Sequence, residues 1–219
     1  MDCDISVPKR KTPADIFIAD ETTITKKLKV TAITSQQQQQ PIIGMDKVDS
    51  SLSSNHFVGR NAPPFCAPAV MPDGDIKNLS LSDYAGRYLV ILFYPADFTF
   101  VCPTEITAFN DSLAQFNAQG CDIVICSTDS EYVHYNWRCQ ARTDGGVGNL
   151  NVPMVSDRTR NISRSYNVLC EETGQAFRGL FIVDKAQRLR TSLVNDLPVG
   201  RSVSEALRLV KELRDVDEY

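Results

Sequence analysis

One cysteine of this 219-residue chain lies where a thiol ionises readily. Cys102 follows the apolar run 87–94 after a short loop, and it directly precedes Pro103, a residue suited to the first turn of a helix. A sulfur at this position faces unpaired backbone N–H groups and the positive end of the helix dipole. Both effects favour the thiolate, which is the nucleophilic form of cysteine. We therefore predict that Cys102 is the nucleophile among the seven cysteines.

Three neighbours of Cys102 have side chains that suit chemistry at a sulfur. The hydroxyl of Thr99 can donate to a thiolate and accept from an incoming peroxide. Pro95 can shield the sulfur from water without competing for its hydrogen bonds. Glu105, about one turn into the predicted helix, can hold an arginine from another element. A lone cysteine is most often a small buried hydrophobe, so the combination of Pro95, Thr99 and Cys102 carries the functional prediction.

Most of the remaining cysteines have a structural interpretation. Cys121 and Cys126 flank or occupy an apolar run that is typical of a buried strand. A zinc site built from Cys121, Cys126, His134 and Cys139 matches no finger or ribbon spacing, so we predict no metal. No pair of cysteines forms a C-x-x-C, which argues against a disulfide reductase.

Two functions can be weighed for a chain that carries such a cysteine. A cysteine hydrolase would need a histidine base, and the chain offers only His56 and His134. His56 falls in the atypical N-terminal segment and His134 in a predicted helix, where a structural role is the simpler interpretation. The second alternative is a redox-regulated holdase or adaptor, which would keep its function without Cys102.

The apolar pattern predicts an α/β domain that would position Cys102. Runs 87–94 and 122–126 are typical of strands covered on both faces. Strands 180–183 and 189–194, joined by a polar turn, predict a hairpin. Helices are predicted over residues 106–116, 130–140, 157–166 and 203–213. Ser202 is the predicted N-cap of the last one. The order of these elements predicts a mixed central sheet flanked by helices.

Residues 1–55 differ from the rest of the chain. They contain five consecutive glutamines at 36–40 and a serine-rich patch at 50–54, with little periodic apolar pattern. Such a segment buries too little apolar surface to offset the entropy lost on ordering. We therefore predict a disordered, low-complexity N-terminal extension and a folded domain over residues 56–219.

Charge and hydropathy restrict the class of partner. A net charge of -4 gives no reason to expect nucleic-acid binding. No apolar run approaches the roughly 20 residues that span a bilayer, so no membrane association is predicted. The first residues are acidic and lack the apolar stretch of a secretory signal. We expect a cytoplasmic protein, with a nuclear alternative from the basic cluster Pro8–Lys11.

The stretch Tyr94-Pro-Ala-Asp-Phe-Thr-Phe-Val-Cys-Pro-Thr-Glu105 resembles the peroxidatic motif of the peroxiredoxins, P-x-x-x-T-x-x-C. It is similar in particular to the typical two-cysteine group, also called thiol-specific antioxidant or alkyl hydroperoxide reductase proteins. The likeness runs from about Val58 to the end of the chain and includes Leu81–Tyr84, Ser127–Ser130, Arg178–Asp184 and Val194–Val203. The resemblance implies a thioredoxin-like fold.

The resemblance also implies a mechanism and partners. The Cys102 thiolate would attack a hydroperoxide in line and become a sulfenic acid, with no metal, haem or flavin. Arg178 matches the family's arginine that stabilises the thiolate and the polarised peroxide, and Arg201 matches a second arginine that fixes the site. The implied role is antioxidant defence and redox signalling. The implied partners are a thioredoxin-like reductant or small thiol, and a second subunit in a homodimer or a ring of dimers.

Two features depart from the two-cysteine group. In that group a resolving cysteine lies beyond the last helix, whereas this sequence ends at Tyr219. We expect truncation, with Cys3, Cys170 or an external small thiol as alternative resolving groups. The loop Gly145–Gly148 reads Gly-Gly-Val-Gly where members sensitive to overoxidation carry Gly-Gly-Leu-Gly, so the sequence leaves that sensitivity open.

Overall fold

The structure, a computed structural model, describes residues 57–99 and 102–219. The predictions for residues 1–55, including the basic cluster Pro8–Lys11, lie outside these ranges. So do His56 and Cys3, which the sequence offered as a histidine base and as a resolving thiol. The described part of the fold begins at Phe57.

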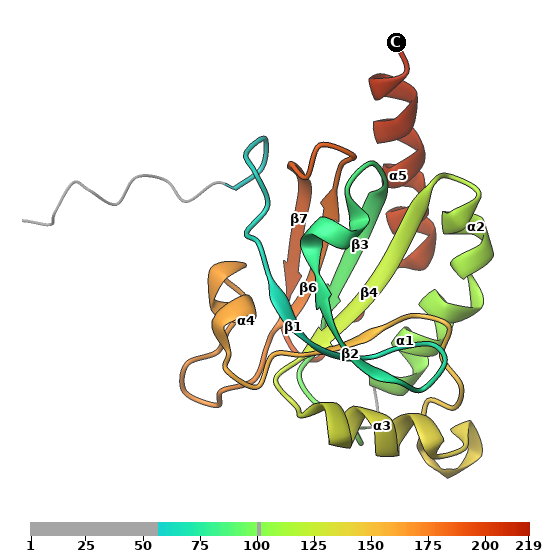
Figure 1. Cartoon of the computed structure of the whole chain (residues 1–219), viewed down its shortest axis with the longest axis vertical. Helices are drawn as coiled ribbons and strands as arrows, with labels where there is room; N and C mark the ends of the chain where they lie inside the picture. The colour runs from blue at the N-terminus through green and yellow to red at the C-terminus, as the bar shows by residue number, and fades with distance from the viewer. Residues whose placement is uncertain (1–56, 100–101) are drawn as a thin grey trace, which may run out of the picture. The chain divides into compact units, whose positions relative to one another are not determined.

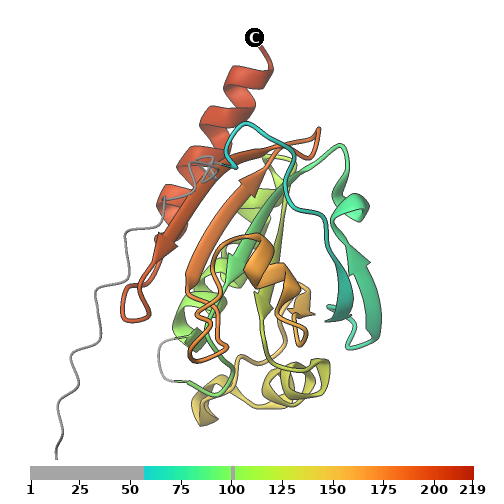
Figure 2. The same ribbon diagram turned by 90° about the vertical axis from the view of Figure 1, so that its left-hand side faces the viewer.

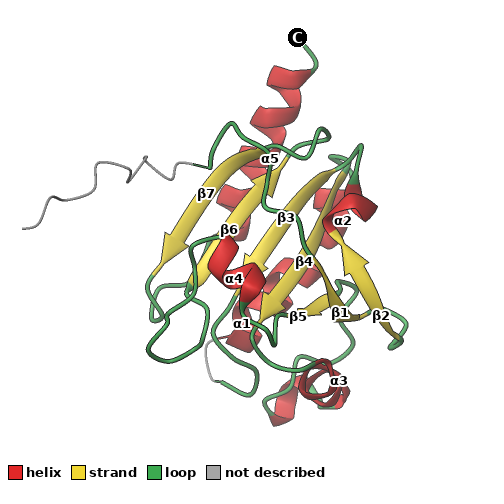
Figure 3. Cartoon of the chain, turned by 60° about the vertical axis from the view of Figure 1, so that its left-hand side comes forward, coloured by secondary structure: helices red, strands yellow, loops and turns green. Residues whose placement is uncertain are grey.

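A seven-stranded mixed sheet forms the centre of this part of the chain (Figure 3). Its strands in sequence are β1 Cys66–Val70, β2 Ile76–Ser80, β3 Tyr88–Phe93, β4 Cys121–Ser127, β5 Met154–Ser156, β6 Arg178–Val183 and β7 Leu189–Asn195. Their order across the sheet is β2-β1-β5-β4-β3-β6-β7. The central pairs β3–β4 and β4–β5 are parallel, while β6 pairs antiparallel with both β3 and β7. The predicted mixed sheet and the hairpin of its last two strands are confirmed.

Five α-helices connect or flank the strands: α1 Cys102–Asp111, α2 Leu113–Asn117, α3 Glu131–Cys139, α4 Asn161–Ser165 and α5 Val203–Asp217. Short 3-10 turns occupy Leu81–Tyr84 and Arg142–Asp144. The predicted cap of the last helix is present, because the hydroxyl of Ser202 accepts from the backbone N–H of Glu205. None of the helices in the described ranges is long and apolar enough to cross a membrane.

Strand β3 feeds both halves of the hydrophobic core, as the alternation of a strand requires. Tyr88, Val90 and Leu92 belong to one buried cluster, together with side chains of α1, α2 and α5. Leu89, Ile91 and Phe93 face the other cluster, which includes side chains next to α4. Figure 3 shows α4 in front of the sheet and α1 and α5 behind it. A strand covered on both faces reads as a continuous apolar run, which is why β3 was predictable.

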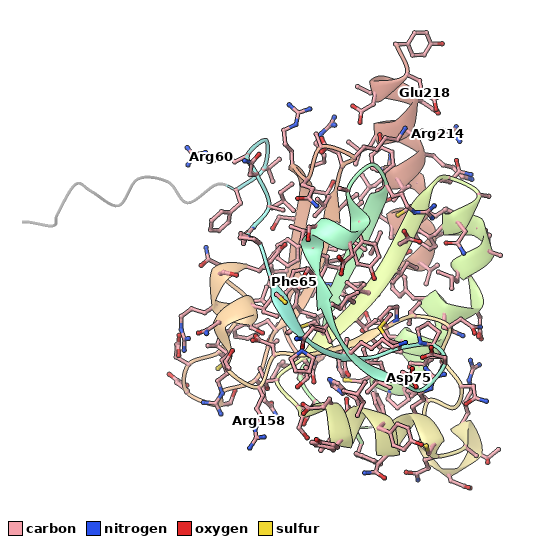
Figure 4. The ribbon with its side chains drawn as sticks, viewed as in Figure 1. Arg60, Phe65, Asp75, Arg158, Arg214 and Glu218 are labelled. Atoms are coloured by element: carbon pink, nitrogen blue, oxygen red, sulfur yellow. The ribbon has the colours of Figure 1, made fainter. Side chains whose placement is uncertain are left out.

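Helix α5 is fixed to the sheet at both ends of its buried face. Ala206, Leu207 and Val210 pack into the core. Near the other end, the Tyr88 hydroxyl donates to Asp217 at 2.5 Å. The last turns, where Arg214 and Glu218 lie, extend past the sheet (Figure 4). Because α5 is held in place, the loop before it, which carries Arg201, is held as well.

Several predicted boundaries were wrong for local reasons. Strands β1, β2 and β5 were missed: β1 reads Cys-Ala-Pro-Ala-Val, β2 is largely exposed, and β5 has three residues. The helix predicted over 106–116 is two helices, because the chain turns at Ser112, where φ is -95° and ψ is 2°. The helix predicted from 157 begins only at Asn161, because its N-cap residue, Arg160, has a left-handed φ of 62°; the Asp157 carboxylate accepts from the backbone N–H groups of Ile162 and Ser163 in its first turn.

Candidate active site

Cys102 is the first residue of α1 and is fully buried. The helix is held against the sheet by Ile106 and Phe109, which lie in the same core cluster as the cysteine. Figures 1 and 2 place the start of α1 and helix α3 toward the end of the molecule that lies opposite the C-terminus. The sulfur therefore lies near the carboxyl ends of the parallel strands, where α/β folds commonly bind ligands.

A guanidinium lies beside this sulfur. Nη2 of Arg178 lies 3.6 Å from Sγ of Cys102. The guanidinium of Arg178 is itself held by the Leu197 carbonyl, which accepts from Nε, and by Glu105, whose Oε2 lies 3.1 Å from Nη1. Two of its donors are thus anchored by different parts of the chain, the loop at Leu197 and helix α1, so the position of the cation next to the sulfur is fixed.

Arg201 contacts the same carboxylate but not the sulfur. Its backbone N–H and Nε donate to Oε1 of Glu105 at 2.6 and 2.8 Å, and Nη2 donates to Oε2 at 2.7 Å. Its remaining nitrogen, Nη1, donates to the carbonyls of Phe93 and Gly179. Arg201 therefore anchors Glu105 to the sheet, while Arg178 is the arginine that reaches the cysteine.

The sulfur site, our name for Cys102, Glu105, Arg178 and Arg201, holds two guanidiniums and one carboxylate. These three charged groups leave one uncompensated positive charge among side chains that are 3–8% exposed, next to the fully buried sulfur. A buried charge without a partner is costly, so the site is suited to an anion beside Arg178.

The carboxyl of Glu105 stays ionised through this balance. Burial acts most strongly on its pKa and raises it, but the hydrogen bonds and charge of Arg201, with the charge of Arg178, outweigh burial and hold the pKa below its ordinary value of 4.5. Glu105 is therefore the anion that orients both arginines at neutral pH.

Pro95 and Thr99 precede the gap in the described residues before Cys102. Pro95 is buried at the end of β3. The Thr99 hydroxyl donates to the carbonyl of Ala96 at 3.2 Å, so its hydrogen is directed into the loop. A hydroxyl that donates in this way keeps its lone pairs for accepting a hydrogen bond. Of the two capabilities predicted for Thr99, this geometry leaves the accepting one available.

A buried triad, Tyr94, Asp97 and His134, lies behind the loop that leads to Cys102. The Tyr94 hydroxyl donates to Oδ1 of Asp97 at 2.6 Å, and Nδ1 of His134 lies 2.7 Å from Oδ2. The other ring nitrogen of His134 lies 3.2 Å from the carbonyl of Val155. Burial raises the pKa of Asp97, and hydrogen bonds from His134 and Tyr94 oppose this effect.

Sequence reasoning missed this triad as a unit. Asp97 was part of the recognised motif but was not singled out, and His134 was considered only as a zinc ligand or hydrolase base. Both nitrogens of His134 are engaged by Asp97 and Val155, so this histidine does not serve Cys102 as a base. The one available signal was an acidic residue inside the stretch between Pro95 and Thr99.

The remaining described cysteines differ sharply from Cys102 in their surroundings. Burial, with the charge of Asp122, raises the pKa of Cys121 to about 12, and burial raises that of Cys126 well above its ordinary value. Cys66 and Cys139 are exposed. Hydrogen bonds from the side chain and backbone of Thr173 lower the pKa of Cys170. Across residues 57–99 and 102–219, no group of three or more His, Cys, Asp or Glu side chains is arranged to hold a metal ion.

Comparison with known families and proteins agrees with the geometry of the site. Residues 58–192 match the AhpC/TSA family. A thioredoxin peroxidase of Echinococcus granulosus is 51% identical over 162 residues, which cover 74% of this chain and 83% of that protein. Peroxiredoxin 2 of Drosophila melanogaster is 52% identical over 158 residues, covering 72% of this chain and 81% of the relative.

The fold also resembles that of a solved structure. The crystal structure of reduced 2-Cys peroxiredoxin from Plasmodium vivax superposes with a TM-score of 0.73 at 37% sequence identity. The match covers 74% of this chain and 84% of that one. The predicted thioredoxin-like fold, with a mixed central sheet flanked by helices, is confirmed by this likeness.

Proposed function

Because the chain belongs to the AhpC/TSA family and is a peroxidase of the peroxiredoxin type, we propose that it reduces hydrogen peroxide and organic hydroperoxides through a sulfenic acid on Cys102. The observation that carries this proposal is the 3.6 Å approach of Arg178 to the sulfur, from a guanidinium already fixed by Glu105. A fixed cation beside a buried sulfur both favours the thiolate and meets the charge that develops on the peroxide.

The proposed step is a two-electron transfer from sulfur to the O–O bond. The Cys102 thiolate attacks one peroxide oxygen, an S–O bond forms and the O–O bond breaks. The leaving oxygen departs with the electron pair as RO⁻ and takes up a proton to become an alcohol or water. Arg178 would donate hydrogen bonds to the peroxide oxygens, and the Thr99 hydroxyl would accept a hydrogen bond from the peroxide O–H. A thioredoxin-like protein or a small thiol would then return the two electrons, which makes the cycle suitable for antioxidant defence and redox signalling.

Treatment of the reduced chain with one equivalent of hydrogen peroxide tests this proposal directly. Peptide mass spectrometry of every cysteine is expected to find oxidation at Cys102 first, because the sulfur site lies only there. A disulfide product would name the resolving thiol, with Cys170 as one candidate, and a lasting sulfenic acid would indicate an external thiol. Peroxide that persists while Cys102 remains reduced would contradict the proposal.

The exposed edge of the sheet supports a homodimer. In the described part of the chain β7 is the last strand on its side, and it carries Leu193 and Val194 at 40% and 45% exposure. An apolar edge strand with unpaired backbone groups readily pairs with a second copy of itself about a two-fold axis. We infer that two β7 strands meet in this way and extend the sheet across both subunits.

A double substitution at this edge tests the dimer. Leu193→Lys with Val194→Lys is expected to shift the mass in solution, measured by light scattering after size-exclusion chromatography, from dimer to monomer, because charged edges disfavour pairing. The matched control is Ile76→Lys, which alters an equally exposed apolar residue (42%) on β2 at the opposite edge. If the control variant is a monomer, or if the double variant remains a dimer, the interface lies elsewhere.

A further inference from the structure

The loop that carries Thr99 contains a strained residue at its centre. Phe98 has a φ of 56°, in the left-handed region that bulky side chains avoid, and the residue is 52% exposed. The exposed ring gains little from burial that could offset this conformation, although it contacts Trp137 with centroids 6.0 Å apart. Backbone strain of this kind persists only where neighbouring contacts impose it.

The residue next to it, Asp97, supplies such contacts from both its backbone and its side chain. Its N–H donates to Oδ2 of Asp129 at 2.9 Å, and that oxygen also accepts from Ser127 at the end of β4. Its carboxyl is held by Tyr94 and His134 in the buried triad. Asp97, the residue before the strained Phe98, is therefore held by the segments that follow β3 and β4 and by helix α3.

The neighbours of His134 show which of its ring nitrogens carries a hydrogen. Nε2 of His134 faces the Val155 carbonyl, which only accepts, so this nitrogen carries a hydrogen. The remaining gap between Nδ1 and Oδ2 of Asp97, at 2.7 Å, then holds one shared proton. The polar atoms of the pair thus all have partners, and a fully hydrogen-bonded buried pair is a stable anchor.

We propose that Asp97 and His134 are positioning residues for peroxide reduction: they hold Phe98 in its left-handed conformation and thereby fix Thr99 relative to Cys102. The hydrogen bond from Thr99 to the Ala96 carbonyl closes the loop over these two residues, so a change of backbone at Phe98 moves the Thr99 hydroxyl. The inference rests on the proposed function, because Thr99 matters only if it meets a peroxide.

The role separates peroxide reduction from general thiol reactivity. The cations that favour the thiolate are Arg178 and Arg201, which Glu105 holds in place, and none of these three residues hydrogen-bonds to the triad. Loss of the triad contact should therefore lower the rate of reaction with hydrogen peroxide, because that reaction needs Thr99. The rate of alkylation by iodoacetamide should stay unchanged, because alkylation needs only the thiolate. A merely structural role would lower both rates together.

The first test compares Asp97→Ala with Asp97→Asn in the full chain, using second-order rate constants of Cys102 with each reagent. Asp97→Ala is expected to lower the rate with peroxide about ten- to hundredfold. The alkylation rate should change less than about twofold, and its dependence on pH should match that of the wild type. Asp97→Asn should stay near wild type, because its amide can donate to Nδ1 as a protonated carboxyl would and still accept from Tyr94. Equal peroxide rates for wild type and Asp97→Ala would overturn the proposal.

The second test asks whether the triad acts through Phe98. Adding Phe98→Gly to Asp97→Ala should recover most of the lost peroxide rate, since glycine adopts the left-handed conformation without strain. Adding Phe98→Ala should not, since alanine loses the ring but keeps the strain. Equal recovery by both, or by neither, would overturn the mechanism. If Asp97→Ala fails to fold in a thermal melt, His134→Leu, which cannot hydrogen-bond to Asp97, removes the same contact from the other side and must give the same pattern.

Failure of this inference is distinguishable from failure of the proposed function. If wild-type Cys102 reacts rapidly with peroxide but the triad variants do so equally, the positioning role is wrong and the peroxidase stands. If wild-type Cys102 does not react with peroxide, the proposed function is wrong, and the positioning role falls with it.

Discussion

Replacing Cys102 with serine is expected to abolish peroxide reduction while leaving the fold intact. The hydroxyl of serine is nearly the same size, so the core around the start of α1 keeps its packing. An alcohol has no adjacent base here and does not ionise at neutral pH, so the nucleophile is lost even though Arg178 remains. We expect the rate with hydrogen peroxide to fall at least roughly a thousandfold, measured by peroxide consumption with a thiol reductant present.

The matched controls are Cys66→Ser and Cys139→Ser. Both change an exposed thiol of the same chain to a hydroxyl. Their peroxide rates should equal that of the unmodified protein, because neither sulfur has a partner arrangement like the sulfur site. A Cys102→Ser protein that retains most of its rate would refute the assignment, whatever the controls do.

Glu105→Gln is expected to damage both stability and activity, because one carboxylate holds both arginines. The amide keeps the shape but leaves two buried guanidiniums without their counter-ion. Breaking a buried ion pair by removing one partner typically costs about 3–5 kcal/mol in the free energy of unfolding. Arg178 should then lose its fixed position beside the sulfur, and the peroxide rate should fall with it. Urea unfolding at pH 7 measures the first effect and single-turnover oxidation the second.

The stability difference should depend on pH in a defined direction. The pKa of Glu105 in the folded protein lies below its ordinary value of 4.5, so its ionised form stabilises the fold at pH values above 4.5. This contribution is lost as the pH falls through the lower, folded-state pKa. The gap in unfolding free energy between the wild type and Glu105→Gln should therefore narrow in acid.

A surface carboxylate provides the control for this prediction. Glu212 pairs with Arg208 on the exposed face of α5. Glu212→Gln should change the unfolding free energy by less than about 1 kcal/mol, because exposed ion pairs contribute little. If Glu105→Gln behaves like Glu212→Gln at pH 7, the sulfur site does not depend on the charge balance described above.

The sequence alone predicted the part of the site that is local along the chain. Pro95, Thr99, Cys102 and Glu105 fall within eleven residues at the junction of β3 and α1, and their spacing is the basis on which we predict their roles. Arg178 and Arg201 lie 73 and 96 residues beyond Glu105, and only the resemblance to a family selected them among the arginines. The reason is topological: β6 runs antiparallel to β3, which returns its first residue to the end where β3 finishes. No local pattern encodes that pairing.

The same distinction explains the fold. Strands β3 and β6 are buried along their whole length, and β4 at every residue except Asp122, so all three carry strong apolar runs. Strand β2 exposes most of its residues and β5 is three residues long, so neither has a pattern that a sequence window can detect. The buried triad was missed because the value of an acidic residue at 97 depends on a histidine 37 positions away.

The wide separation of Glu105 from its two arginines also sets when the cysteine becomes reactive during synthesis. A ribosome makes Cys102 long before Arg178 and Arg201, and contacts across 73 and 96 residues form only once the sheet has closed around them. Until then the nascent thiol lacks the cation that Arg178 places beside it in the folded protein. We therefore expect Cys102 to become reactive only with the completed fold, so that the growing chain is less open to oxidation at this residue.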